Sequence, residues 1–210
     1  MTRDPVMRLG SGSVDVSFTF PADREILALH EKYAPSPEAL DSVYGHCEIV
    51  CRIAERLLAR GFPGADAVNA GLVRAGSLLH DIGVYRLYDE AGNLDHASYI
   101  WHGVLGHELL EAEGLAAGIC RFASCHTGVG ISREDVIRQG LPLPAADYLA
   151  ETPEEKVVMY ADKFHTKSSP PRLLTPDEYA ASVRRFGDDK VATFEAMRAQ
   201  FGDPDLTRLG

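Results

Sequence analysis

Imidazole and carboxylate side chains recur in this sequence where a helical pattern turns them towards the protein interior. Apolar residues follow His46 at i+4, i+7 and i+11, so its imidazole lies on the apolar stripe of its helix. His102 is followed by leucines at i+3 and i+7, His126 follows apolar residues on the preceding turns, and Asp162 lies one turn beyond Val158. The candidate metal ligands are His46, His80, Asp81, His102, His126 and Asp162.

Each of these residues alone is better interpreted as a hydrogen-bonded core residue than as a ligand. The whole set changes that interpretation, because burying several imidazoles and two carboxylates without a cation costs several kcal/mol per ion. Neutral imidazole and ionised carboxylate are ligands that divalent first-row metals accept. The pattern therefore predicts a metal site.

The adjacent pair His80-Asp81 ends the segment AGSLLHDIG and is the most specific signal. Neighbouring residues of a helix point about 100° apart, so the two side chains reach a metal from different edges of the helix end. The carboxylate of Asp81 has two oxygens and is able to bridge two ions. We therefore assign Asp81 as both a metal ligand and the catalytic residue.

The elements that position these groups are predicted to be helices. Strand-like alternation is almost absent, while Pro and capping residues mark several helix starts. Residues 1–20 are expected to be an N-terminal arm with a short strand at Val14–Phe20, and residues 21–210 one helical domain. The expected fold is an all-α bundle of about seven or eight helices, with helices from about 21, at 36–60, 66–81, 98–113 and 115–125, from 152, from 175 and after 187.

The long connection between residues 127 and 151 contains three Gly and two Pro and separates two helices that carry candidate ligands. Long loops of this kind are often lids or binding loops, and a surface excursion without a role is the alternative. A short helix at 132–139 is expected inside it.

Composition limits the partners. A net charge of -10 over 210 residues disfavours long nucleic acids, although a small phosphorylated molecule in a locally positive pocket is compatible with it. No apolar run is as long as that of a signal peptide or a membrane span, so a cytoplasmic protein with no membrane partner is expected. The four cysteines form no CxxC pair and are expected to be reduced and buried. The sequence is compatible with a homodimer.

With these residues in view, the sequence resembles the HD superfamily of metal-dependent phosphohydrolases, in particular its HDIG subset, over a motif core of about 40–164. The family order H…HD…D is met by His46, His80-Asp81 and Asp162 in MYADKF, and the resemblance implies that these four bind one metal. Members with two metals add two histidines, which His102 in WHGVLGHE and His126 in SCHTG supply. The ligand pattern is most similar to that of HD-type symmetrical diadenosine-tetraphosphate hydrolases. The GYP element of the cyclic-dinucleotide phosphodiesterases is missing from the sequence.

The resemblance implies hydrolysis of a nucleotide or another small phosphate ester or anhydride by metal-activated water. Two divalent ions are expected, iron or manganese in preference to cobalt, zinc or magnesium. Two alternatives stay open: an HD-type diiron oxygenase with the same ligand order, and a non-catalytic regulatory module that binds metal or nucleotide. Cations near the phosphoryl oxygens are needed for hydrolysis, and the expected substrate-binding residues are Lys163, Lys167, Arg172 and Thr127.

Overall fold

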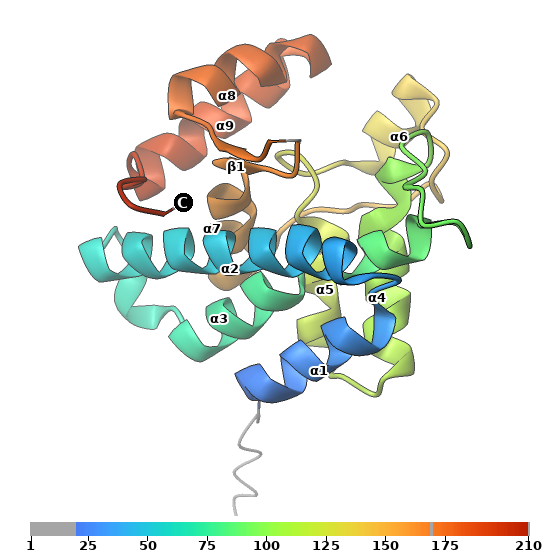
Figure 1. Cartoon of the computed structure of the whole chain (residues 1–210). Helices are drawn as coiled ribbons and strands as arrows, with labels where there is room; N and C mark the ends of the chain where they lie inside the picture. Colours follow the sequence, from blue (N-terminus) through green and yellow to red (C-terminus); the bar gives the residue numbers. More distant parts are fainter. Residues whose placement is uncertain (1–19, 169, 210) are drawn as a thin grey trace, which may run out of the picture.

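The computed structural model describes residues 20–168 and 170–209, and almost all of this part of the chain is helix and loop (Figure 1). The all-α class is confirmed, and the described residues form nine α-helices where about seven or eight were expected. Their bounds are α1 Asp23–Tyr33, α2 Pro37–Arg60, α3 Ala70–Leu79, α4 His102–Ala112, α5 Ala117–Cys125, α6 Arg133–Gln139, α7 Pro153–Asp162, α8 Pro176–Val183 and α9 Asp188–Phe201. Four short 3₁₀ helices join them: η1 Ala65–Ala67, η2 Ile82–Leu87, η3 Tyr99–Trp101 and η4 Arg184–Phe186.

Helix starts follow the capping pattern in the sequence. The Thr152 hydroxyl accepts from the backbone N–H of Glu155 at 3.2 Å, and the Glu155 carboxylate accepts the N–H of Thr152 at 3.1 Å. Thr175 and Ser132 make the same reciprocal caps for α8 and α6. These caps satisfy backbone donors that a helix start leaves unpaired, and they set where the ligand-bearing α7 begins.

The predicted start of the third helix was wrong. A helix from residue 66 was expected, but Asp66 lies in η1 and α3 begins only at Ala70. The Asn69 side chain caps α3 by accepting the N–H of Leu72 at 3.1 Å, and the backbone N–H of Asn69 donates to the Glu154 carboxylate at 2.8 Å. A tertiary contact with α7 therefore fixes this boundary.

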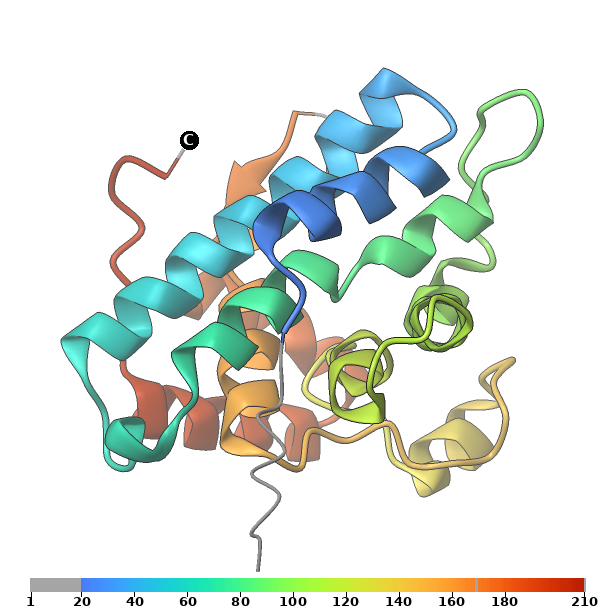
Figure 2. The same ribbon diagram turned by 90° about the horizontal axis from the view of Figure 1, so that it is seen from below.

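The long helix α2 runs beside α1 and α3 (Figure 2) and contributes residues to two hydrophobic clusters. One cluster joins α2 to α7 and to α9 through residues such as Tyr160 and Phe194. The other joins α2 to α1, η2, α4 and α5 through residues such as Ile26, Leu79 and Leu109. The ends of α3 and α7 lie where these clusters meet.

A close approach of backbones brings η2 onto α4. A Cβ atom on Gly83 would lie 2.1 Å from the carbonyl oxygen of His102 and 2.3 Å from the backbone nitrogen of Gly106, so only glycine fits there. This contact places Asp81, two residues earlier, beside the start of α4.

The described residues contain one small sheet, in which β1 (His165–Thr166) pairs antiparallel with β2 (Arg172–Leu173). It follows α7 directly and turns the chain back over the end of that helix. A strand was expected at Val14–Phe20. Residues 14–19 lie outside the described part of the chain, and Phe20 is not in a strand. No helix within 20–168 and 170–209 is both long and apolar enough to cross a membrane.

Candidate metal centre

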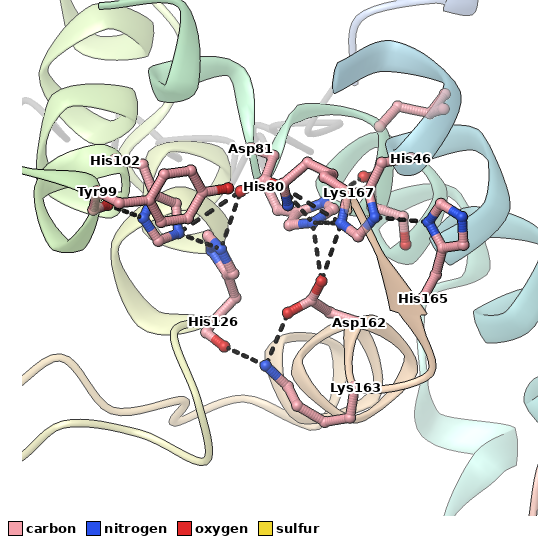
Figure 3. Close-up of polar contacts among 12 residues, drawn as sticks. His46, His80, Asp81, Tyr99, His102, His126, Asp162, Lys163, His165 and Lys167 are labelled. Atoms are coloured by element: carbon pink, nitrogen blue, oxygen red, sulfur yellow. Dashed lines mark hydrogen bonds and ion pairs between the residues drawn. The ribbon is translucent and has the colours of Figure 1, made fainter. Parts of the chain in front are cut away.

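The six candidate ligands come together in the structure at one buried place (Figure 3). They arise from α2, the α3–η2 junction, the start of α4, the end of α5 and the end of α7. His80 is the last cap residue of α3, and Asp81 begins η2. Helix ends therefore supply most of these side chains.

The first cluster consists of His46, His80 and Asp162. The Nε2 atom of His46 lies 3.2 Å from Nε2 of His80 and 3.0 Å from Oδ1 of Asp162. His80 Nε2 is 3.5 Å from the same carboxylate oxygen. Three ligand atoms thus face one small volume.

The second cluster consists of His102 and His126, whose Nε2 atoms are 3.0 Å apart. Asp81 lies between the two clusters and offers one oxygen to each. Its Oδ2 is 3.3 Å from His46 Nε2, and its Oδ1 is 3.3 Å from His126 Nε2 and 3.6 Å from His102 Nε2. Asp81 therefore has the geometry of a bridging ligand.

In three of the four histidines, the nitrogen that faces away from the site, Nδ1, makes a hydrogen bond to the backbone. The Nδ1 atoms of His80, His102 and His126 donate to backbone carbonyls of Ser77, Tyr99 and Phe122 at 2.7, 2.6 and 3.0 Å. A carbonyl only accepts, so the proton is on Nδ1 and the Nε2 lone pair faces the site. Such outer contacts orient metal-binding histidines.

The arrangement fits a divalent cation better than it fits a protein core without one. The unprotonated Nε2 atoms of His102 and His126 face each other at 3.0 Å, and Asp81 Oδ1 is buried with no hydrogen-bond partner among the described residues. Burial lowers the pKa of His46 to about 3 and that of His102 to about 4, so both are neutral at pH 7, in the form that binds metal.

The carboxylates are ionised. Burial alone would raise their pKa values, but Lys167 and the nearby histidines together outweigh it for Asp81, and Lys163 with His46 and His80 does so for Asp162, so both pKa values lie well below the usual range. The buried carboxylate of Asp81, the slightly exposed one of Asp162 and the imidazoles form the oxygen and nitrogen donor set of a first-row divalent metal.

The cations expected to bind substrate lie in different places. The Lys163 ammonium is buried and donates to Asp162 Oδ2 at 2.7 Å and to the carbonyl of His126 at 3.0 Å. Its contacts are with the ligands themselves, and its role in substrate binding stays a prediction.

Lys167 pairs with Asp81, and both Lys167 and Thr127 line the cavity. Arg172, in contrast, is exposed in β2 and pairs with Glu178 at 3.3 Å, away from the cluster. The structure therefore brings Lys163, Lys167 and Thr127 to the site and leaves Arg172 outside it.

Two residues at the site were not predicted from the sequence. The first is His165, whose Nδ1 lies 2.8 Å from Nδ1 of His46 and whose ring stacks on that of His46. Since His46 Nε2 faces the metal cluster, His46 donates and His165 accepts. Tyr99 was not considered, and its ring packs on His102 with centroids 4.8 Å apart. Neither lies on an apolar stripe, and so periodicity gave no signal for them.

A cavity of about 670 Å³ opens from the two clusters of candidate ligands, and this volume is typical of a small-molecule site. Its walls include the start of the long connection (127–131) and part of α6, so this connection forms part of the pocket. Lys190 and Arg185 add positive charge to the wall formed by η4 and α9. The four cysteines are free and buried, as expected.

Comparison with known proteins gives a family match. The HD domain family matches residues 43–167. A tRNA (cytidine(56)-2'-O)-methyltransferase of Picrophilus torridus is 38% identical over 129 residues, covering 60% of this chain but 32% of that protein. A protein with the same name from Thermoplasma volcanium is 31% identical over 68% of this chain and 36% of its own length. The chain therefore spans about a third of these two relatives.

An uncharacterized protein of Methanocaldococcus jannaschii is 38% identical over 129 residues, covering 60% of this chain and 69% of that protein. Among solved structures, the HD domain of the L. monocytogenes phosphodiesterase PgpH superposes with a TM-score of 0.49 and 18% identity, covering 87% of this chain and 89% of that domain. The same domain in complex with cyclic-di-AMP also has a TM-score of 0.49.

Proposed function

The chain belongs to the HD domain family, and we propose that it is a metal-dependent phosphohydrolase acting on a nucleotide or another small phosphate ester or anhydride. One observation carries the proposal. Asp81 directs one carboxylate oxygen to His46 and the other to His102 and His126, which is the arrangement needed to hold two ions side by side. Paired ions of this kind are used to clamp the attacking and leaving oxygens of a phosphoryl group.

Divalent ions bound there would lower the pKa of a coordinated water and neutralise phosphoryl charge. Residues of the chain would position the ligands and add positive charge. Asp81 holds the two clusters together, and Lys163 fixes Asp162 and the His126 backbone in place. Lys167, half-buried at the cavity wall, supplies an ammonium for the phosphoryl oxygens. Positioning and charge account for most of the catalysis of phosphoryl transfer.

The cavity supports a small substrate. Its volume of about 670 Å³ accommodates a nucleotide, whereas the net charge of -10 disfavours a long polyanion. We propose iron or manganese as the working metal, because imidazole and carboxylate without thiolate suit these ions.

The names of two relatives refer to methylation of tRNA. Because the matched region is about a third of each of those proteins, we do not assign their activity to this chain. An RNA-derived nucleotide nevertheless belongs among the candidate substrates.

Metal analysis followed by a substrate screen tests the proposal. Purified protein is assayed for bound metal and then for phosphate release from nucleotides, dinucleoside polyphosphates, RNA-derived nucleotides and sugar phosphates, with manganese, iron, cobalt or magnesium. His126→Ala should abolish hydrolysis. The matched control is His107→Ala, since His107 is a half-buried histidine of α4 that contacts Ser124 and not the site.

Three outcomes distinguish the alternatives. Phosphate release that requires metal and His126 supports the proposal. Oxygen consumption by the reduced iron form, without hydrolysis, would indicate an oxygenase. Nucleotide binding without turnover under every metal would indicate a regulatory binding module.

A further inference from the structure

Tyr99 packs against the second cluster, which consists of His102 and His126. Its backbone carbonyl accepts the Nδ1 proton of His102 at 2.6 Å, and its ring packs on the His102 imidazole at a tilt of 33°. These two contacts belong to the backbone and the ring. They leave the phenol hydroxyl free for another purpose.

The Tyr99 hydroxyl is buried and has no hydrogen-bond partner among residues 20–168 and 170–209. In Figure 3 it points towards Asp81, and the residue lines the cavity. A buried polar group without a partner destabilises the fold, so a protein keeps one chiefly where a ligand supplies the partner. The other buried side-chain atoms without a partner among the described residues are Asp81 Oδ1, for which a metal ion would account, and Ser77 Oγ, whose residue does not line the cavity.

The missing partner is a hydrogen-bond acceptor, and the surroundings favour one with negative charge. A phenol is protonated at neutral pH and donates one hydrogen bond. The nearby carboxylate of Asp81 is committed to its proposed role between the clusters, whereas a phosphoryl group brings several oxygens into the same space. The ammonium of Lys167, which pairs with Asp81, lies 5.9 Å from the Tyr99 ring centroid, so a phosphoryl group bound here would lie close to a cation.

We propose that Tyr99 is a further catalytic residue, whose hydroxyl donates a hydrogen bond to a phosphoryl oxygen of the substrate held beside Asp81 and His102. This inference rests on the proposed function. The hydroxyl keeps its proton throughout, and no bond to it forms or breaks. It stabilises the charge that phosphoryl transfer spreads over the equatorial oxygens.

Tyr99→Phe tests the inference because it keeps the ring and the backbone carbonyl and removes only the hydroxyl. Inorganic phosphate is the probe, and its affinity for the manganese-loaded protein is measured by titration calorimetry. A hydrogen bond to a charged acceptor predicts a Kd about 10-fold to 100-fold weaker in the variant. The metal content should be unchanged, and the unfolding temperature unchanged or higher.

Tyr85→Phe is the matched control. Tyr85 is a buried tyrosine whose hydroxyl, unlike that of Tyr99, has a partner, Nδ1 of His30 at 2.9 Å, and it does not line the cavity. Removing that hydroxyl should lower the unfolding temperature and leave phosphate affinity unchanged. Tyr99→Phe is therefore expected to lose phosphate affinity and keep its stability, and Tyr85→Phe to do the opposite. A general effect of removing a tyrosine hydroxyl would change both variants in the same way.

The inference is overturned if Tyr99→Phe binds phosphate within twofold of the wild type, or if it loses a metal ion, because the residue would then act on the ligands alone. These results are distinct from failure of the proposed function. In that case the metal-loaded wild type itself would bind no phosphate and hydrolyse no phosphate compound.

Discussion

Replacing Asp81 by asparagine should remove both metal ions, whereas removing a histidine of the second cluster should remove one. Asp81→Asn keeps the shape of the side chain and abolishes the carboxylate charge that faces both clusters, through Oδ2 near His46 and Oδ1 near His126. His102→Ala leaves His46, His80 and Asp162 intact. Metal content per chain should therefore be about two in the wild type, about one in His102→Ala and near zero in Asp81→Asn.

The same difference should appear in stability. A ligand at 100 times its Kd stabilises the native state by about 2.7 kcal/mol. For a chain of this size each kcal/mol raises the unfolding temperature by about 2–4 °C, so one ion should add about 5–10 °C and two about twice that. Added metal should thus stabilise His102→Ala by half of the wild-type shift and Asp81→Asn hardly at all.

Plasma emission analysis and thermal unfolding, each with and without a chelator, measure these quantities. His107→Ala is the control, and it should bind two ions with the full thermal shift. An Asp81→Asn protein that holds two ions with a wild-type shift would refute the bridging role. Equal loss in Asp81→Asn and His102→Ala would show that the two clusters do not bind separately.

Three further predictions concern the surroundings of the site. His165→Phe preserves ring stacking but removes the acceptor for His46, so a chelator competition assay should show metal affinity about 10-fold to 100-fold weaker. Gly83→Ala forces α4 away from η2 and should cost about 1–3 kcal/mol in urea unfolding, together with the second ion. Burial lowers the pKa of His30 from its ordinary 6.5 to about 4, so the unfolded state binds the proton first as pH falls. Wild-type stability should therefore fall by up to about 3 kcal/mol between pH 6.5 and 4, and by less in His30→Gln.

The convergence of the candidate ligands could be predicted from the sequence because helical periodicity records which face of a helix is buried. His46 and Asp162 stand on apolar stripes, so their inward direction follows from spacing alone. His165 lies just after α7 has ended, where no period applies, and its contact with His46 spans 119 positions. Such a contact depends on how β1 folds back over α7, which local sequence does not encode.

The direction of long side chains was equally beyond the sequence. Lys163, Lys167 and Arg172 were grouped because they follow Asp162 closely, yet their charged ends reach three different partners. Lys163 contacts Asp162 because it is the cap residue of α7 and its stem runs inside the fold, whereas Arg172 is carried out to solvent by β2. Proximity in sequence predicts shared charge, but tertiary structure decides where that charge acts.

The two clusters differ in charge and in the helices that carry them, and this difference predicts which metal ion is lost first. The first cluster has its own carboxylate, Asp162, besides its share of Asp81, whereas the second has two neutral histidines and only Asp81. The first cluster therefore attracts a cation more strongly. The second is carried by α4 and α5, which pack against each other and are held to η2 through Gly83. The second ion thus depends on a glycine contact and on one shared carboxylate, so changes that loosen α4 should convert a two-metal site into a one-metal site before they disturb the first cluster.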